Sequence, residues 1–168
     1  RQMCIRDRYH NKSKFDIYGF FHGPIKDNLH YEIQGYFKKF YDINKLSTDE
    51  TVKLSRKLGI DIAVNLTGYT ADSKNLIYLN RVAPIQISFV GYSGTMGANF
   101  MDYIIGDKIL IPEKNYEYYT EKVLNFPNSF FPGQKKIEVS DKKFSKESLN
   151  LTGENFIFGN FNNTYKIT

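Results

Sequence analysis

The chain has 168 residues, and its 23 lysines and arginines exceed its 18 aspartates and glutamates, which gives a formal net charge of +5. Hydrophobic residues make up 41% and charged residues 24%, which fits a globular chain and excludes collagen-like and strongly charged disordered classes. The longest apolar runs stay well short of the roughly 18 residues that a membrane-spanning helix needs.

Residues 1–8, with the sequence RQMCIRDR, differ in composition from the rest of the chain, because they hold three arginines and the single cysteine, Cys4. They lack the apolar core of a signal peptide, and we interpret them as a foreign segment. Without them the net charge is +3, carried by scattered lysines, which favours a solvated surface over a nucleic-acid footprint. A disulfide scaffold and a cysteine-ligated metal site are excluded.

The first predicted elements lie between residues 15 and 59. The apolar run at 15–21 predicts a strand, and apolar residues spaced by three or four predict a helix over 28–40. Ser47 and Glu50 have the spacing of a capping box, so we expect a helix that begins there and stops at Gly59.

Apolar stretches and helix-like stretches then alternate as far as Phe126. We predict strands at 60–66, 85–90, 102–106 and 122–126, with helices at 73–80 and 113–119. This alternation predicts an α/β fold with a mainly parallel sheet. Beyond it, residues 127–144 are irregular and predict a linker, 144–151 a short helical piece, and 155–161 a new strand.

Three polar loops follow predicted strands, at 65–70, 91–97 and 162–166. Ligands in open α/β sheets bind at the carboxyl ends of strands, where hydroxyls and amides suit a sugar. Lys166 would suit a diphosphate. The glycines of 91–97 are equally typical of a plain turn, and a lone lysine is usually a surface residue, so both alternatives stay open.

No catalytic set can be assembled from the sequence alone. His10, His22 and His30 share no metal-ligand spacing, and we expect them to be exposed and no metal to bind. Asp102 could act as a base, but a structural hydrogen bond at the end of a strand is favoured. Neither a Ser–His–Asp set nor a pair of catalytic carboxylates is evident.

Three segments together resemble a known family: GIDIAVNLTGYT, then RVAPIQISFVGYSGTMGANFMDYIIGD, then FGNFNNTYKIT. They are similar to the catalytic region of O-linked N-acetylglucosaminyltransferases of the bacterial, TPR-containing type. That family also includes the SPINDLY-type protein O-fucosyltransferases. The resemblance covers residues 9–168.

The resemblance implies a GT-B fold, in which a sugar nucleotide lies between two Rossmann-like lobes. We therefore expect residues 9–126 to form part of the first lobe, with a parallel sheet and flanking helices. Residues 127–154 would be the linker, and 155–168 the first strand and loop of the second lobe, where the chain is truncated. Since the histidines of the family lie upstream of residue 9, no catalytic base is assigned, and the fragment alone should not turn over.

The resemblance also implies roles for the loop residues. Lys166 would be catalytic by neutralising the leaving UDP, with Tyr165 beside the diphosphate and Asn163 on the nucleotide. Val90, Gly91 and Ser93 would line the sugar pocket. Tyr69 and Thr70 would border the acceptor polypeptide. Ser93 replaces the usual proline, and Ala71-Asp72 replaces the usual Lys-Gly, so the acceptor preference is open.

The expected function is inverting transfer of GlcNAc from UDP-GlcNAc to Ser or Thr of acceptor proteins, with no metal or cofactor. The partners would be the nucleotide sugar and acceptor polypeptides, not nucleic acid or membrane, and we expect a cytoplasmic protein. Protein O-fucosylation and a non-catalytic, protein-binding remnant of a TPR protein are the alternatives. An oxidoreductase is disfavoured because the dinucleotide fingerprint is missing.

Overall fold

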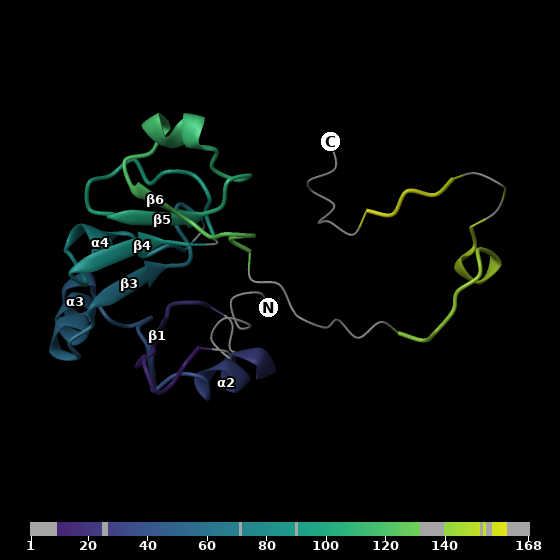
Figure 1. Cartoon of the computed structure of the whole chain (residues 1–168). Helices are drawn as coiled ribbons and strands as arrows, with labels where there is room; N and C mark the ends of the chain where they lie inside the picture. The colour runs from purple at the N-terminus through teal and green to yellow at the C-terminus, as the bar shows by residue number, and fades with distance from the viewer. Residues whose placement is uncertain are drawn as a thin grey trace. The chain divides into compact units, whose positions relative to one another are not determined.

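The computed structural model describes residues 10–24, 27–70, 72–89, 91–131, 140–151, 153 and 156–160. The chain forms two compact units, residues 1–134 and 135–168. Strands and helices alternate through the first unit (Figure 1). No described helix is long and apolar enough to cross a membrane.

The first unit opens with a two-stranded parallel sheet. Strand β1 (Tyr18–Phe21) leads into helix α2 (Asn28–Gln34), and β2 (Lys39–Asp42) returns beside β1. The predicted helix over 28–40 is therefore too long, because it ends at Gln34, residues 35–38 form a turn, and the strand begins at Lys39. Phe37 and Phe40 continue the helical spacing, but backbone pairing with β1 decides the conformation, beginning with the bond from Lys38 N–H to the Ile17 carbonyl at 2.8 Å.

Helix α3 (Thr48–Lys57) begins as the sequence predicts. The Ser47 hydroxyl accepts a bond from Glu50 N–H at 3.2 Å, and the Glu50 carboxylate accepts one from Ser47 N–H at 2.8 Å. The helix ends before Gly59, whose φ of +66° is the left-handed conformation that glycine adopts without strain. The capping box and the stop are both confirmed.

The main sheet has four parallel strands in the order β3–β4–β5–β6 (Figure 1). These are β3 (Ile62–Asn65), β4 (Ile85–Ser88), β5 (Tyr103–Gly106) and β6 (Lys122–Asn125). Each lies inside its predicted range. The connections carry α4 (Leu76–Leu79), shorter than the predicted 73–80, and a 3₁₀ helix at Glu113–Tyr118. The predicted α/β arrangement with a parallel sheet is confirmed.

Helices α3 and α4 pack on one face of this sheet. Val52 from α3 and Ile77 from α4 contact the buried Val82, with Ala63 of β3 beneath them. The two residues that β4 buries, Gln86 and Ser88, are polar. Buried polar groups are costly unless they are hydrogen-bonded, and Gln86 carries a network of its own, whereas the Ser88 hydroxyl has no hydrogen-bond partner among the described residues.

The second unit contains a 3₁₀ helix at Glu147–Leu149, in the range where a short helical piece was predicted. The strand predicted at 155–161 is not formed over the described residues 156–160. Phe156 and Phe158 are 82% and 88% exposed. A strand needs a partner for its N–H and C=O groups, and the described part of this unit holds no strand beside it.

Candidate functional site

Two loops meet at the carboxyl ends of β3 and β4. The first, residues 66–70, carries Tyr69 and Thr70, and the second, residues 91–97, carries Gly91 and Ser93. Since β3 and β4 are parallel neighbours, their carboxyl ends lie at one edge of the sheet. The structure therefore brings these four predicted site residues to the same edge.

Asn65, the last residue of β3, organises the first loop. It is 2% exposed, and its Oδ1 atom accepts bonds from Thr67 N–H and Gly68 N–H, each at 3.0 Å. Its Nδ2 atom donates to Asn75 Oδ1 at 3.2 Å, and Asn75 in turn donates to the Gly68 carbonyl at 2.9 Å. The turn is thus fixed by buried amides, which is why a polar residue ends this strand.

Glycines allow the two loops to touch backbone to backbone. A Cβ atom on Gly91 would lie 1.8 Å from the Leu66 carbonyl oxygen, and one on Gly68 would lie 2.3 Å from Tyr92 Cβ. Gly68 also has a φ of +56°, so a side chain there would be strained as well. The glycines of the 91–97 loop hence do more than mark a turn, since one of them permits the contact between the loops.

Tyr69 joins the two loops through its side chain. Its hydroxyl donates to the Met96 carbonyl at 2.8 Å, and its ring meets the Tyr92 ring edge-on at a centroid distance of 5.7 Å. The side chain nevertheless stays 55% exposed. Tyr69 therefore braces the 91–97 loop with its hydroxyl while much of its ring remains available to a ligand.

Tyr119 supports the second loop from the segment before β6. Its hydroxyl donates to the Ser93 carbonyl at 3.2 Å. Burial raises the pKa of Tyr119, and the neighbouring Glu121 and Tyr92 raise it further. The hydroxyl therefore keeps its proton at neutral pH and stays a donor to Ser93.

The chemistry that these loops offer is binding rather than proton transfer. The segments 66–70 and 91–97 contain hydroxyls, peptide groups and aromatic rings, but no carboxylate and no imidazole. Ser93 and Thr70 are exposed at the sheet edge. Such a surface suits a neutral polar ligand such as a sugar ring, and the groups that activate the reactants must come from elsewhere.

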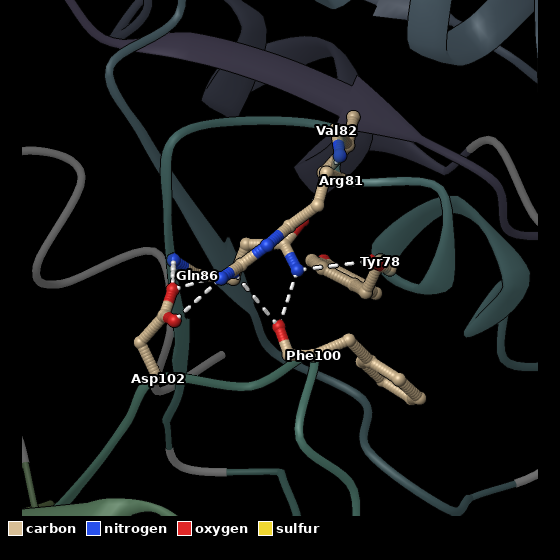
Figure 2. A network of polar contacts seen from close by, with 6 residues as sticks. All are labelled: Tyr78, Arg81, Val82, Gln86, Phe100 and Asp102. Carbon is tan, nitrogen blue, oxygen red and sulfur yellow. Dashed lines mark hydrogen bonds and ion pairs between the residues drawn. The ribbon is translucent and has the colours of Figure 1, made fainter.

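Asp102 is structural, as favoured from the sequence. Figure 2 shows it in a network at the opposite edge of the sheet, where β4 and β5 begin. Its carboxylate receives two bonds from the Arg81 guanidinium, at 2.7 and 2.8 Å, and one from Gln86 N–H at 2.8 Å. Arg81 holds the pKa of Asp102 below its usual value, so this carboxylate is a poor base.

Gln86 completes that network and is fully buried. Its side-chain amide donates to the carbonyls of Tyr78 and Phe100, and its carbonyl oxygen accepts from Val82 N–H at 2.9 Å (Figure 2). The APIQ and MDYII segments, on which the family resemblance partly rests, thus hold the scaffold together on the side away from the loops.

Asp107 is a further carboxylate that the sequence did not single out. It follows β5 and is 6% exposed, and its oxygens accept N–H bonds from Ile109, Leu110 and Phe130 at 2.8 to 2.9 Å. Those backbone bonds, first from Leu110 and then from Phe130, lower the pKa of Asp107. It closes a turn, and only its place at a strand end could have drawn attention to it.

The histidines differ from expectation. His30 is 6% exposed and packs between the rings of Phe21 and Phe40, so the prediction that it is exposed is wrong. Edge-on contacts with these two rings stabilise the His30 ring in the interior. His10 and His22 are partly buried. Among the described residues, no group of three His, Cys, Asp or Glu side chains could hold a metal ion.

Four of the predicted site residues, Val90, Asn163, Tyr165 and Lys166, lie outside the described residues. Their roles stay predictions. The structure therefore unites the expected acceptor loop with the expected sugar loop, at the level of Tyr69, Thr70, Gly91 and Ser93.

Comparison with known proteins points to one family. The model of glycosyl transferase family 41 matches residues 3–148. The probable UDP-N-acetylglucosamine--peptide N-acetylglucosaminyltransferase SEC of Arabidopsis thaliana is 32% identical over 165 residues, which cover 94% of this chain and 17% of that protein. The corresponding SPINDLY protein of Oryza sativa subsp. japonica is 34% identical over 128 residues, 76% of this chain and 13% of that protein.

A solved structure shares the fold. A lysine-to-methionine mutant of the O-GlcNAc transferase from Thermobaculum terrenum superposes with a TM-score of 0.76 at 26% identity, over 78% of this chain and 25% of that chain. The predicted fold class, a Rossmann-like α/β lobe of the GT-B type, is confirmed. The chain spans less than a fifth of the length of the two curated relatives.

Proposed function

The chain belongs to glycosyltransferase family 41, and on that basis we propose that the full-length protein transfers N-acetylglucosamine from UDP-GlcNAc to Ser or Thr hydroxyls of acceptor proteins. The observation that carries this proposal is the family match over residues 3–148. Relatives named for N-acetylglucosaminyl transfer to peptides support it. Since the chain is a small part of those relatives, activity, donor and acceptor are proposals for the whole protein.

The transfer that we propose makes one bond and breaks one. The acceptor oxygen bonds to C1 of the sugar as the bond from C1 to the UDP oxygen breaks, so the configuration at C1 inverts. The acceptor proton passes to a base that is not among the residues assigned here, and negative charge builds up on the departing diphosphate. We assign Lys166 to stabilise that charge, with Tyr165 beside the diphosphate and Asn163 on the nucleotide.

The described loops would bind the reactants on either side of this reaction. Gly91 and Ser93, with Val90, would line the sugar pocket, and the exposed ring of Tyr69 with Thr70 would border the acceptor polypeptide. The geometry supports a shared site, because Tyr69 touches the 91–97 loop through Met96 and Tyr92. Binding of the sugar and binding of the acceptor should therefore be coupled.

The experiment is a transfer assay with the full-length protein, comparing UDP-GlcNAc and GDP-fucose as donors to candidate acceptor proteins. We expect GlcNAc transfer, and Lys166→Ala should lower its rate on the order of 100-fold. Lys53→Ala, on the exposed side of α3, is the control and should leave the rate unchanged. Normal transfer by Lys166→Ala would show the assignment of Lys166 to be wrong. Transfer from GDP-fucose but not from UDP-GlcNAc would show that the proposed donor is wrong and that the protein is a fucosyltransferase.

The other predicted functions are not favoured. The SEC relative carries a name for N-acetylglucosaminyl transfer, which supports GlcNAc over fucose, and both relatives carry names of enzymes, which supports an enzyme over a binding remnant. A cytoplasmic location, and acceptor polypeptides held by TPR repeats, belong to the same proposal. Detection of GlcNAc on cytoplasmic proteins of the source cell, lost on deletion of the gene, would support the location, and loss of the modification on deletion of the repeats alone would support their role in holding acceptors.

A further inference from the structure

The loop between β4 and β5 is held in place by the short segment that precedes β6. Three successive N–H groups of the loop are bound by side chains. Met96 N–H donates to Glu121 Oε1 at 2.7 Å, Gly97 N–H to Thr95 Oγ1 at 2.9 Å, and Ala98 N–H to Thr120 Oγ1 at 3.1 Å. The conformation of the loop thus depends in part on Thr120 and Glu121, which lie 22 to 25 residues further along the chain.

Glu121 is the centre of this arrangement. It is 3% exposed, and its second oxygen accepts the hydroxyls of Thr95 at 2.6 Å and Thr120 at 3.2 Å. The donors that reach it within the described residues are neutral. A buried carboxylate is costly unless such bonds satisfy it, and charge-assisted bonds of this length are among the stronger ones. Glu121 is therefore bound firmly to the loop rather than merely near it.

Thr95 has no hydrogen-bonding capacity left over. A threonine hydroxyl has one proton and two lone pairs. The proton goes to Glu121, and the lone pairs face the N–H groups of Gly97 and Thr120 at 2.9 and 3.3 Å and the Thr120 hydroxyl at 3.2 Å. Removal of the carboxylate would free the hydroxyl to turn and would weaken the bond to Gly97.

Met96, the residue that Glu121 binds through its N–H, is also bound from the candidate site through its carbonyl. Met96 is 2% exposed, its N–H lies on Glu121, and its carbonyl accepts the Tyr69 hydroxyl at 2.8 Å. A shift of the Met96 backbone must therefore move Tyr69 or break its bond. Ser93, three residues earlier in the loop, would move with it.

We infer that Glu121 is a positioning residue for the proposed glycosyl transfer, which this inference presupposes. It does not touch the reactants. It fixes Met96 directly through the N–H of that residue and fixes Thr95 through its hydroxyl, and thereby sets the distance between the sugar loop at Gly91 and Ser93 and the acceptor loop at Tyr69. A misplacement of about 1 Å in a catalytic site can cost on the order of 100-fold in rate.

The test compares variants of the full-length protein in the GlcNAc transfer assay. Glu121→Ala should lower kcat/KM by about 10- to 100-fold, while Glu121→Gln, whose amide oxygen can still accept from Met96, should stay within about fivefold of wild type. Gln86→Ala is the matched control, because it removes a buried polar side chain with three hydrogen bonds at the opposite edge of the sheet. It should lower the melting temperature with less than about a threefold change in kcat/KM.

Two further measurements separate positioning from stability. Thr95→Val keeps the shape and removes the hydroxyl, so it should reproduce part of the Glu121→Ala loss even where Glu121→Ala folds poorly. Hydrogen exchange of the Met96 amide should accelerate at least about tenfold in Glu121→Ala but not in Gln86→Ala. Equal transfer losses in Glu121→Ala and Gln86→Ala would overturn the inference alone, whereas a full-length wild type without GlcNAc transfer would overturn the proposed function and this inference with it.

Discussion

The contact between Gly91 and the Leu66 carbonyl makes Gly91→Ala a sharp test of how the site is built. An added Cβ atom would lie 1.8 Å from the Leu66 oxygen and 2.8 Å from its carbonyl carbon, whereas Cβ atoms in proteins are essentially never closer than 3.0 Å to a neighbour. Both partners on the Leu66 side are backbone, so no side chain can turn away. The two loops must separate until the contact opens from 1.8 Å to at least 3.0 Å.

That separation has two expected costs. Overpacking of this kind lowers the free energy of unfolding by about 1–3 kcal/mol. A displacement of about 1 Å between the sugar and acceptor loops should also lower kcat/KM on the order of 100-fold in the proposed transfer. Thermal unfolding gives the first quantity, and the transfer assay with full-length protein gives the second.

Two other glycines provide controls for Gly91→Ala. Gly35→Ala places a Cβ atom 3.6 Å from the Glu32 carbonyl, an ordinary contact, and should be nearly neutral. Gly97→Ala meets nothing within 4 Å but has a φ of +59°, so it introduces backbone strain of about 1–2 kcal/mol without a clash. If Gly91→Ala were as stable and active as Gly35→Ala, the close approach of the loops would not be what fixes the site.

The scaffold permits two further predictions. Arg81→Ala removes the partner that lowers the pKa of Asp102. A lowered carboxyl pKa stabilises the fold above about pH 4, and that stability is lost as the pH falls. In Arg81→Ala the free energy of unfolding, measured by urea titrations at several pH values, should therefore fall less steeply on the acid side. An unchanged acid slope would contradict the role given to the ion pair. Ser47→Ala should lower the free energy of unfolding by about 1 kcal/mol through loss of the capping box, measured by denaturation, with Glu50→Gln as a milder variant that keeps a capping side chain; equal losses would count against the cap.

The sequence predicts the strands of the main sheet well, because buried parallel strands are short apolar runs bounded by glycine, proline or polar residues. It fails at residues 35–40, where Phe37 and Phe40 fit a helix, but the chain turns at 35–38 and pairing with β1 makes a strand from Lys39. It fails again at 156–160, where an apolar run predicts a strand but the second unit supplies no partner among its described residues. The local pattern thus locates the segments that are buried, and pairing with other strands in the tertiary structure determines whether such a segment becomes a strand.

For the site, strand ends were enough to locate the two loops but not the residues that support them. The choice of Tyr69, Thr70, Gly91 and Ser93 within those loops came from the family resemblance. Glu121 could not be found in this way, because it precedes a strand and meets its partner Met96 only through tertiary structure. Nothing in the local sequence distinguishes its carboxylate from the exposed ones around it.

The network of Arg81, Gln86 and Asp102 lies at the strand starts, whereas the loops of the candidate site lie at the strand ends, and this separation matters for protein engineering. Library design can leave the first set and Tyr69, whose hydroxyl binds Met96, fixed and randomise exposed positions such as 70 and 93, with little loss of folded variants. The same division suggests how donor or acceptor preference could diversify in evolution while the lobe itself stays unchanged. Ser93 would be a natural first position for such a library, because it is exposed and is held only through its backbone carbonyl in the contacts described above.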